Sequence, residues 1–177
     1  METASRDRAR AWGPQLRYIR DGGFEAAVEL GYAPLYLLRV RGGLTYAAVD
    51  AIHDLLLELA EQALDEGRGG IAYVTHMNGL RQGEAGARNY YSTRATELRR
   101  SIHGELNRGE WCVVSSAVVR GTLQAISWLT SRERDTHFRG SWQQAVAEAC
   151  EALERCGEAV ESGAERYRFP ANSPPAT

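Results

Sequence analysis

The sequence predicts an α/β fold: a single mixed, mainly parallel sheet of five to six strands, with an N-terminal antiparallel hairpin and four amphipathic helices. Short apolar runs, typical of buried strands, alternate with longer segments whose apolar residues recur every three or four positions. Strands that alternate with helices require crossover connections, which produce parallel pairing. The length of 177 residues fits one domain of this kind.

The hairpin is expected first, as two strands over 16–20 and 24–30 joined across Asp21-Gly22-Gly23. Glycine adopts the positive φ angles of tight hairpin turns, so this triplet is a strong turn signal. A third strand is expected over 35–40, where LYLLRV is apolar enough to be covered on both faces. Gly42-Gly43 is expected to end it.

A helix is expected after Thr45, which is suited to be its N-cap. Its apolar stripe, at steps of three and four residues, consists of Val49, Ile52, Leu56, Leu59 and Ala63. A second buried strand is predicted over 71–77. A glycine-rich loop over 78–86 and a long helix over about 87–107 then follow.

The last elements repeat this alternation. A third buried strand over 111–116 leads directly into a helix, a short strand is expected over 136–138, and Ser141 is expected to cap the final helix. The inner side of the helix after the third strand is predicted to carry Val119, Leu123, Ile126 and Leu129 or Thr130.

The two ends of the chain differ from this core. Residues 1–13 form a polar, Arg-rich leader, residues 14–162 the α/β domain, and residues 163–177 a polar tail with three of the five prolines. The sequence leaves open whether either end docks on the domain.

Composition excludes several classes of function. The chain has 21 Arg and no Lys against 23 acidic residues, a net charge of −2, so it lacks the basic footprint of a nucleic-acid-binding protein. No run approaches the ~18 apolar residues of a membrane span, and no secretory signal is visible, so a cytoplasmic location is expected. The three cysteines, Cys112, Cys150 and Cys156, are expected to be free thiols. No spacing of ligands predicts a metal site, and no cofactor is expected.

One stretch, VVSSAVVRGTLQAISWLT over 113–130, points to a family. With the hairpin and the alternating elements before it, and the early aromatic and QAV run after it, the chain over about 16–153 resembles the STAS family of anti-sigma-factor-antagonist-like domains. The similarity is to a divergent bacterial branch, and most of the matched positions are core positions.

The resemblance implies a non-enzymatic regulatory domain that works by protein–protein interaction in bacterial signalling, through partner switching or as a scaffold. The family's phosphorylatable Ser follows an Asp at the start of the helix after the central strand. Here Glu84 and Ala85 fall at about those positions, so the chain departs from the pattern. Glu84 would leave a fixed negative charge at the N-terminus of that helix. Phosphorylation of Ser92 or Thr93, about two turns further on, stays open.

The resemblance also places the partner surface on the loop over 78–86 and the first turns of the next helix. Tyr and Arg, which are enriched at interfaces, gather there, and at least one of the adjacent tyrosines Tyr90 and Tyr91 is expected to be exposed. The predicted partner-binding residues are Arg81, Glu84, Arg88, Tyr90 and Arg94.

Two alternatives to a partner-binding role remain at this stage. The first is a small-ligand binder or enzyme that uses the crevice at the carboxyl ends of the strands, where open α/β sheets place their ligands. Its residues would be His76, Asn78, Ser115, Ser116 and Arg120. The sequence also allows structural roles, in which His76 ties the loop to the backbone and Ser116 caps a helix. The second alternative is a self-assembling component, with a homodimer possible. His53 and His103 are expected to flank their helices or face solvent.

Overall fold

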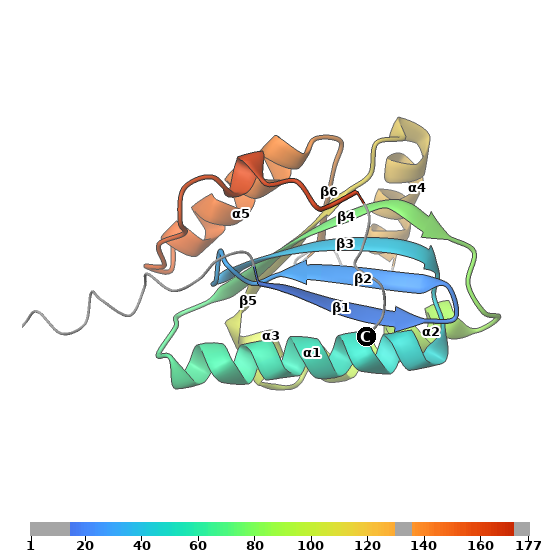
Figure 1. Cartoon of the computed structure of the whole chain (residues 1–177), viewed down its shortest axis with the longest axis horizontal. Coiled ribbons are helices and arrows are strands. Elements are labelled where there is room, and N and C mark those ends of the chain that lie inside the picture. Colours follow the sequence, from blue (N-terminus) through green and yellow to red (C-terminus); the bar gives the residue numbers. More distant parts are fainter. Residues whose placement is uncertain (1–14, 130–135, 172–177) are drawn as a thin grey trace, which may run out of the picture.

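The computed structural model describes residues 15–129 and 136–171, which form one six-stranded sheet with helices on both faces (Figure 1). The strands lie side by side in chain order: β1 Leu16–Asp21, β2 Phe24–Glu29, β3 Leu35–Gly43, β4 Ile71–Arg81, β5 Asn107–Val113 and β6 Thr136–Arg139. The pairs β1–β2 and β2–β3 are antiparallel, and the three later pairs are parallel. The predicted class, a mainly parallel sheet with an N-terminal hairpin, is confirmed.

The helices of the described residues are α1 Tyr46–Asp65, α2 Ala87–Arg99, α3 Ile102–Leu106, α4 Ala117–Leu129, α5 Trp142–Glu154 and the short 3-10 helix η2 Ala164–Arg166. Thr45 caps α1 by accepting a hydrogen bond from the Ala48 N–H at 3.1 Å, and Ser141 caps α5 through the Gln144 N–H at 3.4 Å. Both caps agree with the sequence prediction. Within the described ranges, no helix combines the length and apolar character that crossing a bilayer requires.

The two faces of the sheet carry separate apolar cores. Leu35 and Leu37 of β3 pack with α5 on one face, whereas Tyr36 and Leu38 pack with α1 on the other. This division follows from the two-residue period of a strand, which sends successive side chains to opposite faces. Figure 1 shows α5 and α1 on opposite sides of the sheet, so the central strands are covered twice.

Strands β3 and β4 are longer than predicted. After a register shift, Arg41 to Gly43 of β3 pair with Gly79 to Arg81 of β4, so part of the expected loop over 78–86 is wrong. Strand β3 ends at Gly43, within the glycine pair that was expected to end it. A Cβ on Gly43 would lie 2.5 Å from the Gln82 carbonyl oxygen. Glycine therefore permits a close approach that lets the pairing continue.

The predicted long helix over 87–107 is in fact two helices. Ser101 Oγ accepts from the His103 N–H at 3.2 Å and so caps α3 as a new helix. A Cβ on Gly104 would overlap the Arg99 carbonyl oxygen, so the tight turn between α2 and α3 depends on glycine. The described residues consequently hold five α-helices where four were predicted.

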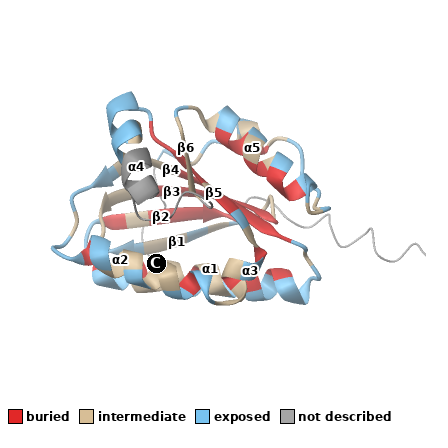
Figure 2. Ribbon diagram, turned by 180° about the vertical axis from the view of Figure 1, so that it is seen from behind, coloured by how far each residue is buried: buried red, intermediate tan, exposed pale blue. Residues whose placement is uncertain are grey.

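Helix α4 differs from the prediction in its first turns. It packs chiefly on β6, and Val119, which was expected on its inner side, is 49% exposed. Of the other residues predicted for that side, Leu123 is partly buried, and the side chains of 124–130 lie outside the described residues. Figure 2 shows the first turns of α4 exposed at one end of the molecule.

Candidate functional site

Asn78, near the carboxyl end of β4, bonds to Ser115, which follows the carboxyl end of the neighbouring strand β5. Its Oδ1 accepts from the Ser115 backbone N–H at 2.8 Å, and its Nδ2 donates to Ser115 Oγ at 2.6 Å. The hydrogen bond from the Ser115 backbone N–H fixes the orientation of the amide, because only Oδ1 can accept it. Nδ2 therefore faces His76, 3.2 Å from Nε2, and donates a hydrogen bond to that nitrogen. His76, Asn78 and Ser115 are therefore brought together, as the crevice interpretation expects.

His76 is neutral in this arrangement, because Nε2 accepts a hydrogen bond. Burial lowers the pKa of His76 below its usual value, and the positive charges of Arg39 and Arg41 lower it further. The ring is also near Trp142, with 6.5 Å between the centroids.

Ser116 and Arg120 have structural partners of their own. Ser116 Oγ accepts from the Val119 N–H at 3.3 Å in the first turn of α4, which is the capping role that the sequence left open. Arg120 Nη1 donates to the Val114 carbonyl at 2.7 Å, and a Cβ on Gly140 would lie 2.8 Å from the same nitrogen. Arg120 thus ties α4 to the end of β5 and to the turn after β6. The described contacts do not join it to His76.

Two of the predicted partner-binding residues face α1. The Tyr90 hydroxyl donates to Asp50 at 2.7 Å, and its ring lies 5.2 Å from that of Tyr46. Arg94 pairs with Asp50 at 3.1 Å through Nε and with Glu97 at 2.5 Å through Nη1. Both side chains are partly buried, so they hold α2 against α1.

The tyrosine next to Tyr90 is also partly buried, so the expectation that Tyr90 or Tyr91 is exposed is wrong. The aromatic ring that is exposed in this region belongs to Tyr46, at 42%, on the neighbouring helix.

The other three predicted partner-binding residues, Arg81, Glu84 and Arg88, are exposed. Glu84 Oε2 accepts from the Tyr46 N–H at 3.2 Å, and the Glu84 N–H donates to the Leu44 carbonyl at 2.9 Å. The fixed charge that the sequence placed at the start of α2 therefore lies at the start of α1, where a carboxylate is also favourable.

Three exposed apolar side chains lie at the same end of the sheet. They are Leu80 near the end of β4, 37% exposed, and Val118 and Val119 in α4, 81% and 49% exposed. The bond between Asn78 and Ser115 links the two segments that carry them. Sequence reasoning did not select these residues, because Val119 fitted the apolar stripe of a buried helix.

The cysteines and the groups that could bind a metal ion bear on a catalytic role. Burial, then the charge of Glu110, raises the pKa of the Cys112 thiol, which makes it a poor nucleophile. All three cysteines are free. Over 15–129 and 136–171, no group of three or more His, Cys, Asp or Glu is arranged to hold a metal ion.

Two hollows stand out in the described part of the chain. One is an open hollow of about 530 Å³ beside the β1–β2 turn, lined by Arg20 to Glu25. The other is a narrow cavity of about 20 Å³ between α1 and α2. Neither hollow is lined by His76 or Arg120, residues of the ligand-binding alternative.

Comparison with known proteins adds information on the fold alone. No family model matches the sequence, and no curated protein matches it. Among solved structures, an uncharacterized protein of the DUF3478 family from Shewanella loihica, described as having a SpoIIAA-like fold, is similar at 15% identity with a TM-score of 0.47. The match covers 78% of this chain and 94% of that one.

Proposed function

We propose that this chain is a non-enzymatic, STAS-like regulatory domain that binds a protein partner in bacterial signalling, through partner switching or as a scaffold. The observation that carries the proposal is the exposure of Leu80, Val118 and Val119 at one end of the sheet. Covering apolar surface releases about 25 cal/mol per Å², so such side chains favour a partner. Together with Arg81 and Arg88 we call these residues the carboxyl-end surface.

The charges of this surface indicate the kind of partner. Arg81 and Arg88 are exposed, and neither forms an ion pair with an acidic side chain of the described residues. Arginine is enriched at interfaces, where it pairs with carboxylates. The partner would present apolar side chains flanked by Asp or Glu.

The hydrogen bonds nearby support binding over catalysis. Asn78, Ser116 and Arg120, which a catalytic interpretation would use, are all engaged in bonds that hold β4, β5 and α4 together. A general base or an anion clamp needs groups that are available to a substrate. We infer that these residues shape the carboxyl-end surface.

Regulation of this domain would differ from a phosphorylation switch. Ala85 cannot be phosphorylated, and the hydroxyls of Ser92 and Thr93 donate to the carbonyls of Arg88 and Asn89 within α2, at 3.1 and 3.3 Å. Binding would then be constitutive or controlled by the partner. The fixed carboxylate of Glu84 braces the loop on α1 instead.

The test is a quantitative pull-down from the native host with the wild type, Val118→Arg and Leu64→Arg. Leu64 is 51% exposed near the end of α1, distant in sequence from the carboxyl-end surface, so it is a matched control. We expect Val118→Arg to reduce recovery of the partner at least about tenfold, a loss of about 1.4 kcal/mol. Leu64→Arg should leave recovery unchanged, and Arg88→Glu should weaken binding most at low salt.

Two results would contradict the proposal. Equal recovery by the wild type and Val118→Arg would remove α4 from the interface. Light scattering of the pure chain that shows a dimer, dissociated by Val118→Arg, would assign the surface to a second copy of the chain.

A further inference from the structure

A cationic patch lies on the face of the sheet that α5 covers elsewhere. Leu35 and Leu37 of β3 face α5, and the alternation of the strand sends Arg39 toward the same face. In the parallel register Arg39 is beside His76 of β4, and after the register shift Arg41 is beside Gly79. Arg39 is nevertheless only 6% exposed.

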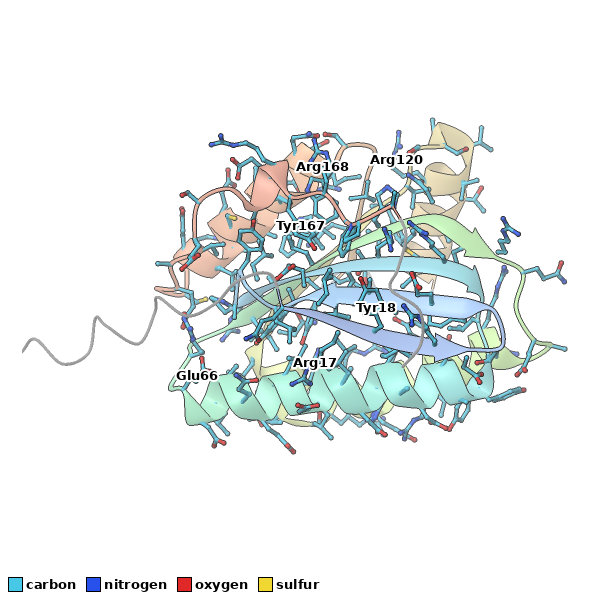
Figure 3. The ribbon with its side chains drawn as sticks, viewed as in Figure 1. Arg17, Tyr18, Glu66, Arg120, Tyr167 and Arg168 are labelled. Atoms are coloured by element: carbon cyan, nitrogen blue, oxygen red, sulfur yellow. The ribbon has the colours of Figure 1, made fainter. Side chains whose placement is uncertain are left out.

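What covers Arg39 is the C-terminal segment, residues 167–171. Phe169 packs edge-on against Trp142, with 6.0 Å between centroids, and the Arg39 guanidinium lies 5.2 Å from the Phe169 ring. Tyr167 packs edge-on against Tyr32 at 5.8 Å. Figure 3 shows Tyr167 on the sheet side of this segment and Arg168 on its outer side.

The C-terminal segment places oxygen atoms on both arginines. Arg39 Nη1 donates to the Pro170 carbonyl at 2.5 Å, and Arg41 donates to the Ala171 carbonyl at 3.3 and 3.4 Å through its two terminal nitrogens. Two guanidinium groups thus bind neutral carbonyl oxygens, although their strongest partners are carboxylates and phosphates.

The charges around this patch are not balanced. Glu25 pairs with Arg39 at 3.3 Å but also with Arg20 at 3.3 Å. Arg41 forms no ion pair with an acidic side chain in the described ranges. Arg39 Nε is buried and has no hydrogen-bond partner among the described residues, an arrangement that is costly for a charged group. Burial lowers the pKa of His76, and the positive charges of Arg39 and Arg41 lower it further.

We propose that Arg39 and Arg41, with His76 beside them, form a binding site for an oxyanion, a phosphate or carboxylate group, which displaces the carbonyl oxygens of Pro170 and Ala171. An anionic oxygen adds the attraction of opposite charges to the hydrogen bond from a guanidinium, and a neutral carbonyl oxygen lacks that attraction, so the anion competes with the segment. Glu25, which pairs with Arg39, repels an anion at this site, so we expect it to disfavour ligands of high negative charge. The site adjoins the carboxyl-end surface but uses different residues, and it does not depend on the proposed function.

The experiment measures binding of inorganic phosphate to the full chain at pH 7, by thermal unfolding at constant ionic strength against chloride, with citrate as the carboxylate probe. A ligand that binds only the folded state raises the melting temperature. We expect phosphate to raise it, and Arg41→Gln to weaken the apparent affinity at least about tenfold, which corresponds to the loss of one charge-assisted contact. Phe169→Ala should strengthen binding several-fold, about 0.5–1 kcal/mol, because it loosens the competing segment.

The control is Arg17→Gln, which removes a guanidinium that pairs with Glu58 of α1 at 2.7 Å, away from the patch (Figure 3). It should bind phosphate as the wild type does. Arg39→Gln is a second test, and Arg41→Gln keeps the proposal testable if the buried substitution prevents folding. An equal response in the wild type and Arg41→Gln, or no response to either anion in Phe169→Ala, would overturn the site. A response to citrate alone would restrict the ligand to carboxylates.

Discussion

His103 is a buried, unpaired histidine on the α1 side of the sheet. It is 4% exposed, its ring lies 5.4 Å from that of Tyr73, and neither ring nitrogen has a hydrogen-bond partner among the described residues. Burial lowers the pKa of His103 to about 4, with a smaller contribution from His53. The ring is therefore neutral near pH 7 and acts as an apolar packing group.

This burial makes stability depend on pH. This histidine binds a proton near pH 6.5 in the unfolded chain and near pH 4 in the folded chain. Its contribution to the free energy of unfolding is therefore fully present above pH 6.5 and is lost as the pH falls toward 4. The loss attributable to His103 is about 3 kcal/mol at most. We expect urea unfolding at pH 7.5 and pH 5.0 to show a smaller difference for His103→Phe than for the wild type. An identical difference would show that His103 does not titrate on unfolding.

At the residue scale, local roles were predictable and packing roles were not. The caps Thr45 and Ser141 were correct because a cap depends on a side chain two or three residues from the group it bonds. The expected solvent exposure of His103 was wrong, because the break at Ser101 rotates α3 relative to the predicted long helix. Tyr90 bonds to Asp50, 40 residues away, which no local pattern indicates.

At the element scale, α2, α3 and α4 differ most from the prediction. A continuous apolar period runs over 87–107, but two local features interrupt the helix: the Ser101 cap and the close approach at Gly104. Helix α4 has the predicted position in the chain but leaves Val118 and Val119 in solvent. Periodicity identifies an apolar face, yet it does not state what covers that face.

Two helical glycines provide a matched test of this view. A Cβ on Gly104 would overlap the Arg99 carbonyl oxygen, whereas a Cβ on Gly121 would meet nothing within 4 Å. We expect Gly104→Ala to destabilise the fold by about 1–3 kcal/mol through overpacking. Gly121→Ala should be neutral or stabilise by up to about 1 kcal/mol, since alanine favours helix. Urea midpoints measure both, and equal effects would contradict the close approach at α3.

At the scale of the whole molecule, the C-terminal segment completes the α5 side. The sequence left its docking open, and the structure places Tyr167 and Phe169 against the core formed by α5 and the sheet. The contacts join residues that lie far apart in the chain: Arg39 and the Pro170 carbonyl are separated by 131 positions. Docking of this segment determines whether the cationic patch is covered.

Adjacent residues of the segment allow a direct test of its docking. Tyr167 is half-buried between Tyr32 and Phe169, while Arg168 is exposed. We expect Tyr167→Ala to lower the free energy of unfolding by about 1–2 kcal/mol, from lost apolar burial. Arg168→Ala should change it by no more than about 0.5 kcal/mol. Thermal and urea unfolding compare the two, and a Tyr167→Ala variant as stable as the wild type would show that the segment is undocked in solution.

The order of strands and helices, the antiparallel hairpin and the caps of α1 and α5 follow from the sequence by itself, because each depends on residues close together in the chain. Only the tertiary structure decided that α4 leaves its first turns exposed, that Tyr90 and Arg94 hold α2 to α1, and that the C-terminal segment covers Arg39. These are contacts between segments that lie far apart in the sequence, and they depend on the twist of the sheet and on how the helices pack against it. The candidate surfaces are made of such contacts, which is why the sequence predicted the fold better than the site.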